Sequence, residues 1–299
     1  MTAPVPVTVG LPVYNREKFV GASLESLLSQ TFTDFEVVIC DNASTDGTGD
    51  ICRDYAARDR RIRYYRNPEN VGANPNFNRV FELSRGKYLK WSTSDDRWEP
   101  DMIEKTYPIM EANPDVVLCY PKTIIVDGED NVLGEYEDNL HLMDDNPATR
   151  FIHLIERIGL CHQHLGLIRR DQLARTALLL NHIASDLNLL AELSLYGKFY
   201  EYPERLFYRR MHPESSSWKK GPSTDAVEHQ LDFTDPQRRL GIRNHLLHRH
   251  RAFLRAIHRA PLTAHDRRRL DLYVLRGIYW NRGFIIREFV EGLRDRFRR

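Results

Sequence analysis

The fold of this chain is decided by a stretch that reads Lys87-Tyr-Leu-Lys-Trp-Ser-Thr-Ser-Asp-Asp-Arg-Trp-Glu-Pro-Asp101. Its first part, Tyr88 to Trp91, is a short apolar run rich in aromatic residues, which predicts a buried strand. Pro100 and the acid after it predict the start of a helix, because proline and acidic residues both suit a first turn. Asp95 and Asp96 therefore lie where a strand gives way to a loop, the edge at which open α/β sheets bind ligands.

The two adjacent carboxylates have two interpretations. Neighbouring acids repel each other unless a cation lies between them or they point apart. A hard divalent cation that also held a diphosphate would account for the pair. The alternative is a solvated turn, in which aspartates are common.

Apolar segments alternate with helical segments along the first 120 residues. This alternation predicts a mostly parallel sheet with right-handed crossovers, an α/β fold of the Rossmann-like kind. The strands are expected at Val5–Leu11, Phe35–Cys40, Ile62–Tyr65, Lys87–Trp91 and Val116–Tyr120, and the helices at Phe19–Leu28, from a cap at Asp46 through Tyr55, at Phe77–Leu83 and at Met102–Met110.

Polar pairs follow three of these strands directly. They are Tyr14-Asn15, Asp41-Asn42 and Asp95-Asp96. Since the carboxyl ends of parallel strands share one edge of the sheet, the three loops should line one crevice. No Gly-x-Gly-x-x-Gly or Gly-Lys-Ser/Thr motif follows the first strand, so a cation rather than a glycine loop would neutralise bound phosphates.

The composition is that of a soluble protein with a proper core. The chain has 299 residues, of which 41% are apolar, and no run approaches the roughly 20 apolar residues of a membrane span. The N-terminus lacks the pattern of a secretion signal, and the four cysteines have no metal-like spacing: Cys40, Cys52, Cys119 and Cys161. We therefore expect a cytoplasmic protein with reduced cysteines.

Four motifs in order resemble a known family. They are Leu11-Pro-Val-Tyr-Asn, Cys40-Asp-Asn-Ala-Ser-Thr-Asp-Gly-Thr, Asn70-Val-Gly-Ala-Asn with the later Asn78, and Ser94-Asp-Asp-Arg-Trp. Together they resemble the nucleotide-binding half of a family 2 inverting glycosyltransferase with the GT-A fold, over roughly residues 5–215. The resemblance implies a nucleotide-sugar donor, usually a UDP-sugar, held with Mg²⁺ or Mn²⁺.

The resemblance also assigns roles to single residues. Pro12, Tyr14 and Asp41 match base-contacting positions, Asp95 matches a ribose or phosphate position, and Asp96 matches the metal-binding carboxylate. The remaining nucleotide-binding candidates stand in the same motifs: Asn15, Asn42 and Asn78. The sequence departs from the family at Thr93, where many members carry a further acid.

The segment after residue 158 supplies candidates for the acceptor side. Cys161, His162 and His164 fit no standard zinc spacing, and strand alternation would place both histidines on one face. We expect His162 and His164, with Arg209, to line an acceptor pocket. In this family a late histidine can complete the metal shell, which makes His212 a second metal candidate beside its reading as a loop residue.

Asp186 stands at the start of an apolar helical segment that Gly197 is expected to end. Capping would be a complete explanation of this aspartate. Inverting transfer also needs a base to take the acceptor hydroxyl proton. The family carries an acidic pair here, and its second acid looks like the base; the first is Ser185 in this chain.

The last part of the chain has a composition of its own. Residues 236–299 hold 17 Lys/Arg against 5 Asp/Glu, whereas the rest of the chain is acidic overall. Apolar stripes and the break at Pro261 predict a helical hairpin, with Thr263 capping its second helix. Three roles are open: covering the chain's own fold, forming a homodimer, or binding an anionic membrane surface at the inner face of the membrane. Nucleic-acid binding would rest on the basic tail alone and is not expected.

These observations predict a metal-assisted glycosyltransferase acting on a saccharide, lipid-linked or small-molecule acceptor. We expect a donor half at 1–120, an acceptor half of the same domain at 121–220, and a basic helical hairpin at 221–299. The sequence leaves two alternatives. A sugar-phosphate nucleotidyltransferase would need a glycine-rich basic loop after the first strand, and a non-catalytic sugar-binding or scaffold protein is favoured only by Thr93.

Overall fold

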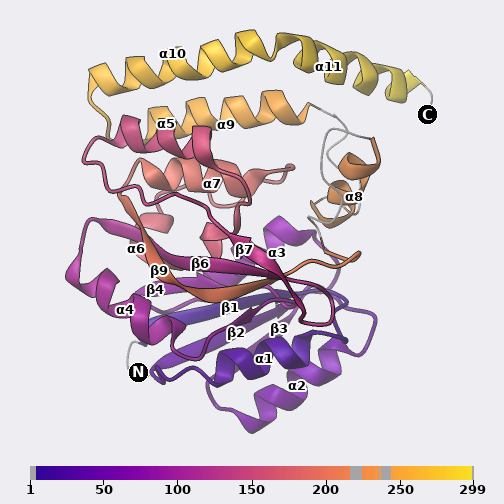
Figure 1. Cartoon of the computed structure of the whole chain (residues 1–299). Coiled ribbons are helices and arrows are strands. Elements are labelled where there is room, and N and C mark those ends of the chain that lie inside the picture. The colour runs from indigo at the N-terminus through magenta and orange to yellow at the C-terminus, as the bar shows by residue number, and fades with distance from the viewer. Residues whose placement is uncertain (1–4, 216–223, 235, 237–243, 298–299) are drawn as a thin grey trace.

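The computed structural model describes residues 5–215, 224–234, 236 and 244–297, with the side chains of 224–228 and 291–297 left aside. Within them one mixed sheet forms the centre of the molecule, with strand order β3-β2-β1-β4-β8-β6-β9-β5 and β7 paired to β6. Helices cover both faces of this sheet (Figure 1). The α/β fold predicted from the sequence is confirmed.

The first half of the sheet is the predicted parallel unit. Strand β1 pairs in parallel with both β2 and β4, and β2 with β3. Strands β1, β2 and β4 are buried along their whole length, which is why they read as continuous apolar runs. The elements are β1 (Val7–Val13), α1 (Val20–Leu28), β2 (Phe35–Asp41), α2 (Thr48–Arg58), β3 (Ile62–Arg66), α3 (Ala73–Leu83) and β4 (Tyr88–Trp91).

The second half of the sheet contains antiparallel as well as parallel strand pairs. Strand β8 runs antiparallel between β4 and β6, and the long β9 then pairs in parallel with β6. Because β6 crosses residue 120, both predicted halves share one sheet. The elements are β5 (Arg97–Trp98), α4 (Met102–Ala112), β6 (Val116–Val126), β7 (Val132–Tyr136), α5 (Pro147–Arg157), β8 (Leu167–Arg169), α6 (Arg170–Leu173), α7 (Ser185–Ser194) and β9 (Lys198–Arg210).

Two local predictions are wrong. The histidine segment is not a strand: His162–Leu165 forms a short 3₁₀ helix, η1, so alternation does not place its side chains. Helix α7 ends at Ser194, before Gly197. That glycine serves close packing instead, since a Cβ there would lie 2.2 Å from a Val117 methyl group.

The C-terminal helices form the predicted hairpin above the α5 and α7 layer (Figure 1). Helix α9 (His245–Arg259) contacts α7, and α10 (Ala264–Trp280) contacts α9 and α5. The Thr263 side chain accepts the Asp266 N–H as the predicted cap. The second helix divides near Asn281 into α10 and α11 (Arg282–Phe297), and α8 (Thr224–Thr234) precedes the hairpin.

The predicted boundary at residues 220 and 221 lies outside the described residues. Leu240, which belongs to the apolar stripe predicted for the first helix of the C-terminal hairpin, also lies outside them. No helix within the described ranges combines the length and apolar character needed to cross a bilayer.

Candidate active site

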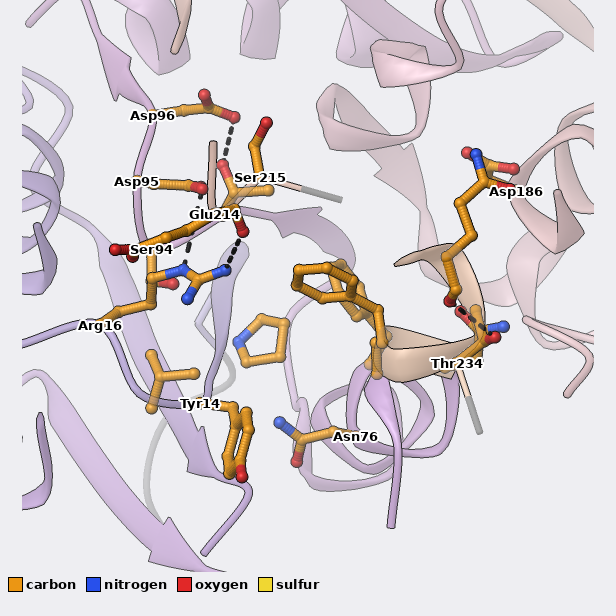
Figure 2. Close-up of a pocket in the computed structure, with 18 of the residues that line it drawn as sticks. Tyr14, Arg16, Asn76, Ser94, Asp95, Asp96, Asp186, Glu214, Ser215 and Thr234 are labelled. Carbon is orange, nitrogen blue, oxygen red and sulfur yellow. Dashed lines mark hydrogen bonds and ion pairs between the residues drawn. The ribbon is translucent and has the colours of Figure 1, made fainter. Parts of the chain in front are cut away.

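A cavity of about 1040 Å³ opens at the carboxyl edge of the parallel strands. The loops after β1 and β4 form one wall of it, and η1 and the start of α7 form another. Figure 2 shows Asp95 and Asp96 on one side and Asp186 on the opposite side. Segments distant in sequence therefore meet around one space. The strand-end argument predicted this for the loops after β1, β2 and β4, and each of them contributes residues to the cavity.

The carboxylate pair at the end of β4 is held from the end of β9. Asp96 accepts the Arg210 backbone N–H at 2.7 Å and the Thr93 hydroxyl. His212 Nε2 lies 3.0 Å from Asp95 Oδ2, on the neighbouring residue. The two acids thus point to different partners, although both line the cavity.

The electrostatics of the two acids differ in the same way. Burial opposes ionisation of Asp95, but the His212 hydrogen bond and the Arg16 charge hold its pKa below the ordinary value. Burial and the charge of Asp95 raise the pKa of Asp96 to about 7. One strongly acidic and one weakly acidic carboxylate stand side by side, an arrangement that a cation would stabilise.

The donor set in this wall suits a divalent cation. Carboxylate oxygens suit Mg²⁺ and Mn²⁺, and an imidazole suits Mn²⁺ better than Mg²⁺. Asp95, Asp96 and His212 would supply these ligands, because His212 lies in hydrogen-bond contact with the pair. Among the described residues no group of three or more His, Cys, Asp or Glu side chains is already gathered as a metal site.

The nucleotide-binding candidates divide into two groups. Pro12, Tyr14, Asn15 and Asn42 line the cavity, and Tyr14 is 39% exposed within it. Two others lie behind the cavity wall. Asp41 is fully buried and accepts from the Ser44 N–H, the Tyr64 hydroxyl and Arg66, while Asn78 exchanges two hydrogen bonds with the Leu179 backbone.

Asn42 is a structural member of the cavity wall. Its amide donates to Asn70 at 2.7 Å and accepts from Asn67 and from the Val71 N–H. These bonds shape the loop before α3, so the motif Asn70-Val-Gly-Ala-Asn is tied to the end of β2.

Asp186 lies in the first turn of α7, at the opposite wall. The N-cap of this helix is Ala184, with a left-handed φ of 59° and no side-chain cap. Asp186 accepts the N–H of the next residue, Leu187, at 2.9 Å, and the Cys161 thiol also lies within hydrogen-bonding reach of its carboxylate. Asp186 therefore does not cap this helix, which was the alternative to the general-base role, and the carboxylate faces the cavity.

Beside Asp186 the wall is buried and apolar in character. His164 donates its Nδ1–H to the Cys161 carbonyl at 2.5 Å, and its ring lies near those of Phe77 and Trp91. Burial lowers the pKa of His164, so it is neutral at physiological pH. Burial and the charge of Asp186 raise the pKa of the Cys161 thiol well above its usual range.

His162 and Arg209 form one buried arrangement. Arg209 donates to His162 Nδ1 at 3.0 Å, so the other ring nitrogen carries the proton and faces Asp138 at 2.6 Å. Gln163 also donates to Asp138. Both ring nitrogens of His162 thus have protein partners, and His162 and Arg209 both line the cavity.

Three contributors to the site were not predicted from the sequence. Arg16 lies 3.9 Å from Asp95 and donates to the Glu214 carbonyl. Phe233 of α8 lies under the Arg16 guanidinium at 5.9 Å, and His229 bonds the Ser215 carbonyl at 2.9 Å. Arg16 directly follows the Tyr14-Asn15 motif, so its position in the sequence could have predicted its place in the site. The sequence of α8 contains no motif that would have predicted its place there.

The class of protein follows from a family model. The glycosyl transferase family 2 model matches residues 8–175, more than half of the chain, so the chain belongs to this family. The matched region contains β1 to β8 and the carboxylate pair.

Curated relatives agree with this assignment. The chain is 27% identical to a chondroitin synthase of Escherichia coli over 215 residues, 72% of this chain and 30% of that protein. It is 32% identical to an uncharacterized glycosyltransferase of Methanocaldococcus jannaschii over 133 residues, 44% of this chain and 46% of that protein. The chain thus spans less than half the length of these relatives.

Solved structures share the fold. TarS of S. aureus in complex with UDP-GlcNAc has a TM-score of 0.60 and 16% identity, over 95% of this chain and 89% of that one. A mannosyltransferase of Pyrobaculum calidifontis in complex with GDP-Man and Mn²⁺ has a TM-score of 0.52 and 16% identity, over 96% and 85%. These likenesses confirm the GT-A architecture that the sequence resemblance implied.

Proposed function

We propose that this chain is a metal-dependent inverting glycosyltransferase that moves a sugar from a nucleotide-sugar donor to an acceptor hydroxyl. One observation carries the proposal. Asp95, which is partly buried, and Asp96, which is buried, face the Asp186 carboxylate across one large cavity. Asp95 and Asp96 could hold a cation that binds a diphosphate, and Asp186 could accept a proton.

The donor is proposed to be a UDP-sugar. In the wall that would bind the donor, Pro12, Tyr14 and Asn15 would contact the nucleobase. Asn42, Asp41 and Asn78 would support this wall from behind. A solved relative in fold is complexed with UDP-GlcNAc, which supports UDP, and another with GDP-Man, which makes GDP the control nucleotide.

The chemistry follows from the two walls. The acceptor hydroxyl gives its proton to the Asp186 carboxylate while its oxygen forms a bond to the anomeric carbon of the donor sugar. The bond from that carbon to the diphosphate oxygen breaks, and the diphosphate leaves with the electron pair, so the anomeric configuration inverts. A divalent cation, held by Asp96 with Asp95 and His212, would neutralise the diphosphate charge.

Positively charged and neutral groups would complete the site. Arg209 is held by His162. Its positive charge acts on both Asp96 and Cys161, where it favours the ionised form and lowers the pKa. We propose that it binds the acceptor or the departing diphosphate, and that the neutral His164 lines the acceptor pocket. A saccharide, a lipid-linked sugar and a small-molecule alcohol are the acceptor classes to test.

The alternatives have less support. Family membership does not favour a sugar-phosphate nucleotidyltransferase. The scaffold hypothesis rested on Thr93, yet the Thr93 hydroxyl donates to Asp96 and lowers its pKa against the effects of burial and Asp95. This residue therefore supports the carboxylate that a third acid would otherwise repel.

The test is a panel of nucleotide sugars scored by nucleoside-diphosphate release, with Mn²⁺, with Mg²⁺ and with EDTA. Activity with one UDP-sugar, lost in EDTA, is expected, and the anomer of the product by NMR tests inversion. Cleavage to a sugar phosphate and a nucleoside monophosphate would instead indicate a different enzyme class. We further propose a cytoplasmic location.

A further inference from the structure

Helices α10 and α11 are apolar on two opposite sides. The inner side packs on the body of the protein: Leu270 and Val274 are buried, and Ile278 is half-buried against the core. The outer side carries large apolar side chains that are exposed: Leu272, Leu275, Tyr279, Trp280, Phe284, Ile286, Phe289 and Val290.

The outer residues follow helical spacing. Leu272, Tyr279 and Ile286 are seven residues apart and are 68%, 61% and 61% exposed. They share a face because helical hydrogen bonds continue through the junction, from Asn281 to Gly277 and from Ile285 to Asn281. Contiguous exposed apolar surface of this kind marks an interaction site, since a solvated helix is polar on its outer side.

Arginines are interleaved with the exposed rings. The guanidinium of Arg276 lies 4.2 Å from the Trp280 ring, that of Arg282 lies 4.2 Å from the Tyr279 ring, and that of Arg287 lies 5.6 Å from the Phe284 ring. Each guanidinium group therefore lies beside an exposed aromatic ring. Basic and aromatic side chains are mixed in the same way on helices that bind at a membrane interface.

The acidic side chains of these helices that the structure describes contact other parts of the protein. Asp266 accepts from Asn146 of the α5 start, Asp271 pairs with His258 of α9, and Glu288 accepts the Leu246 N–H of α9. Between Ala264 and Val290 these are the acidic residues of the sequence. The outer face thus combines apolar and positively charged groups, with its negative charges turned toward the protein.

We propose that the outer face of α10 and α11 docks the protein on the surface of a bilayer that contains anionic lipids. The rings and aliphatic groups would enter the headgroup layer, and the arginines would contact lipid phosphates. A second copy of the chain fits this face less well, because a two-fold contact would bring Arg276, Arg282 and Arg287 of both copies together, while the acids between Ala264 and Val290 are engaged within the protein.

The inference goes beyond the proposed function and needs no donor, metal or acceptor for its test. Flotation of the full-length chain is measured with phosphatidylcholine vesicles and with vesicles in which about a third of the lipid is phosphatidylglycerol. Light scattering of the same samples without vesicles gives the oligomeric state. Binding to the anionic vesicles is expected, weakened in high salt because screening acts on exposed charges.

Two sets of variants separate the contributions. The charge set is R276E/R282E/R287E and the apolar set is L272Q/Y279Q/I286Q, all at exposed positions where folding is retained. The matched charge control is R53E/R58E/R60E, in exposed residues of α2 and its following turn at the other end of the molecule.

Partitioning should fall by at least about 10²-fold in the charge set, since each basic residue near anionic lipid contributes roughly a fivefold factor. The apolar set should also lose binding, and the α2 control should retain it. The proposal is overturned if wild type ignores anionic vesicles at low salt, if the two triple variants bind as wild type does, or if the α2 control loses as much. A dimer that the apolar set dissociates, with no vesicle binding, would assign this face to a second copy instead.

Discussion

His212 Nε2 lies 3.0 Å from Asp95, while the adjacent Asp96 accepts the Arg210 backbone N–H at 2.7 Å. Arg210, the last residue of β9, and His212, two residues later, therefore hold the two adjacent members of the carboxylate pair. Because one short segment fixes both acids, the pair is preorganised before any ligand arrives. This relationship makes Asp96 the group whose loss should be felt first in donor binding.

Asp96→Asn should remove most metal-dependent donor binding. The amide can still accept the Arg210 N–H, so the fold should hold, but a neutral amide is a far poorer ligand for a hard cation. Affinity for UDP with Mn²⁺, measured by calorimetry, should fall by more than about 100-fold, beyond what loss of a ligand-orienting partner costs. The control is Asp50→Asn on the surface of α2, whose side chain is 84% exposed. Unchanged affinity in the Asp96 variant would disprove the metal assignment.

Donor binding with Mn²⁺ should depend on pH through Asp96. Its pKa of about 7 in the folded protein without metal, raised by burial and by Asp95, means that a proton competes with the cation below pH 7. Affinity should therefore fall by up to about tenfold per pH unit as the pH drops below 7 and level off above it.

Thr93→Val sharpens the pH test. The Thr93 hydrogen bond lowers the pKa of Asp96, so its removal should move the midpoint of the profile to higher pH. UDP itself titrates equally with both proteins, so only the difference between them is diagnostic. Superimposable profiles, or a flat profile for wild type, would contradict this assignment.

The sequence predicted the parallel half of the fold because its signals are local. Apolar runs, turn residues and helical spacing alternate from Val7 to Trp91, and each polar pair stands directly after its strand. Convergence of Asp95 and Tyr14 on one cavity then followed from the topology of parallel strands. The same reasoning could not reach β8, which is inserted antiparallel between β4 and β6 by long-range pairing.

The part of the site that sequence reasoning missed depends on contacts between distant segments. The letters Cys161-His-Gln-His-Leu fit an alternating strand as well as the 3₁₀ turn that they form. Only the tertiary fold places Asp138 against His162, and so makes this cavity-lining histidine a support for Arg209 as well. Periodicity carries no information on which buried polar groups will meet.

His162→Ala should reduce both stability and transfer. It leaves Asp138 buried without its imidazole donor and Arg209 without its acceptor on the ring. An unsatisfied buried polar group costs about 1–3 kcal/mol, so the urea midpoint should fall clearly. The loss of donor turnover should exceed that of the exposed control His265→Ala, which should behave as wild type. A stability change within about 0.5 kcal/mol, typical of surface substitutions, would refute the supporting role.

Gly166→Ala tests the fold at the junction of η1 and β8, independently of the chemistry. A Cβ there would lie 2.5 Å from the Cys119 carbonyl oxygen and 2.7 Å from Tyr120 Cβ, both in β6. Such overpacking costs typically about 1–3 kcal/mol in unfolding free energy. The matched control is Gly283→Ala in α11, where nothing lies within 4 Å and alanine should stabilise the helix by up to about 1 kcal/mol. Urea denaturation measures both, and equal effects would mean that η1 does not approach β6 as closely as described.

Asp186→Asn should abolish most transfer while leaving donor binding and stability unchanged. The amide can still accept the Leu187 N–H but cannot take a proton, so the expected loss is on the order of 10²–10⁴-fold in turnover. Asp171 offers a matched control, because it accepts the N–H of its own next residue at 2.9 Å in the first turn of α6 and is exposed. Asp171→Asn should therefore repeat the local change without the chemical one. Turnover is measured with the donor and acceptor that the panel selects, beside calorimetric UDP affinity and thermal unfolding. If Asp186→Asn turns over like Asp171→Asn with an intact fold, the proton goes elsewhere, and Asp186 contributes only to the shape of the cavity.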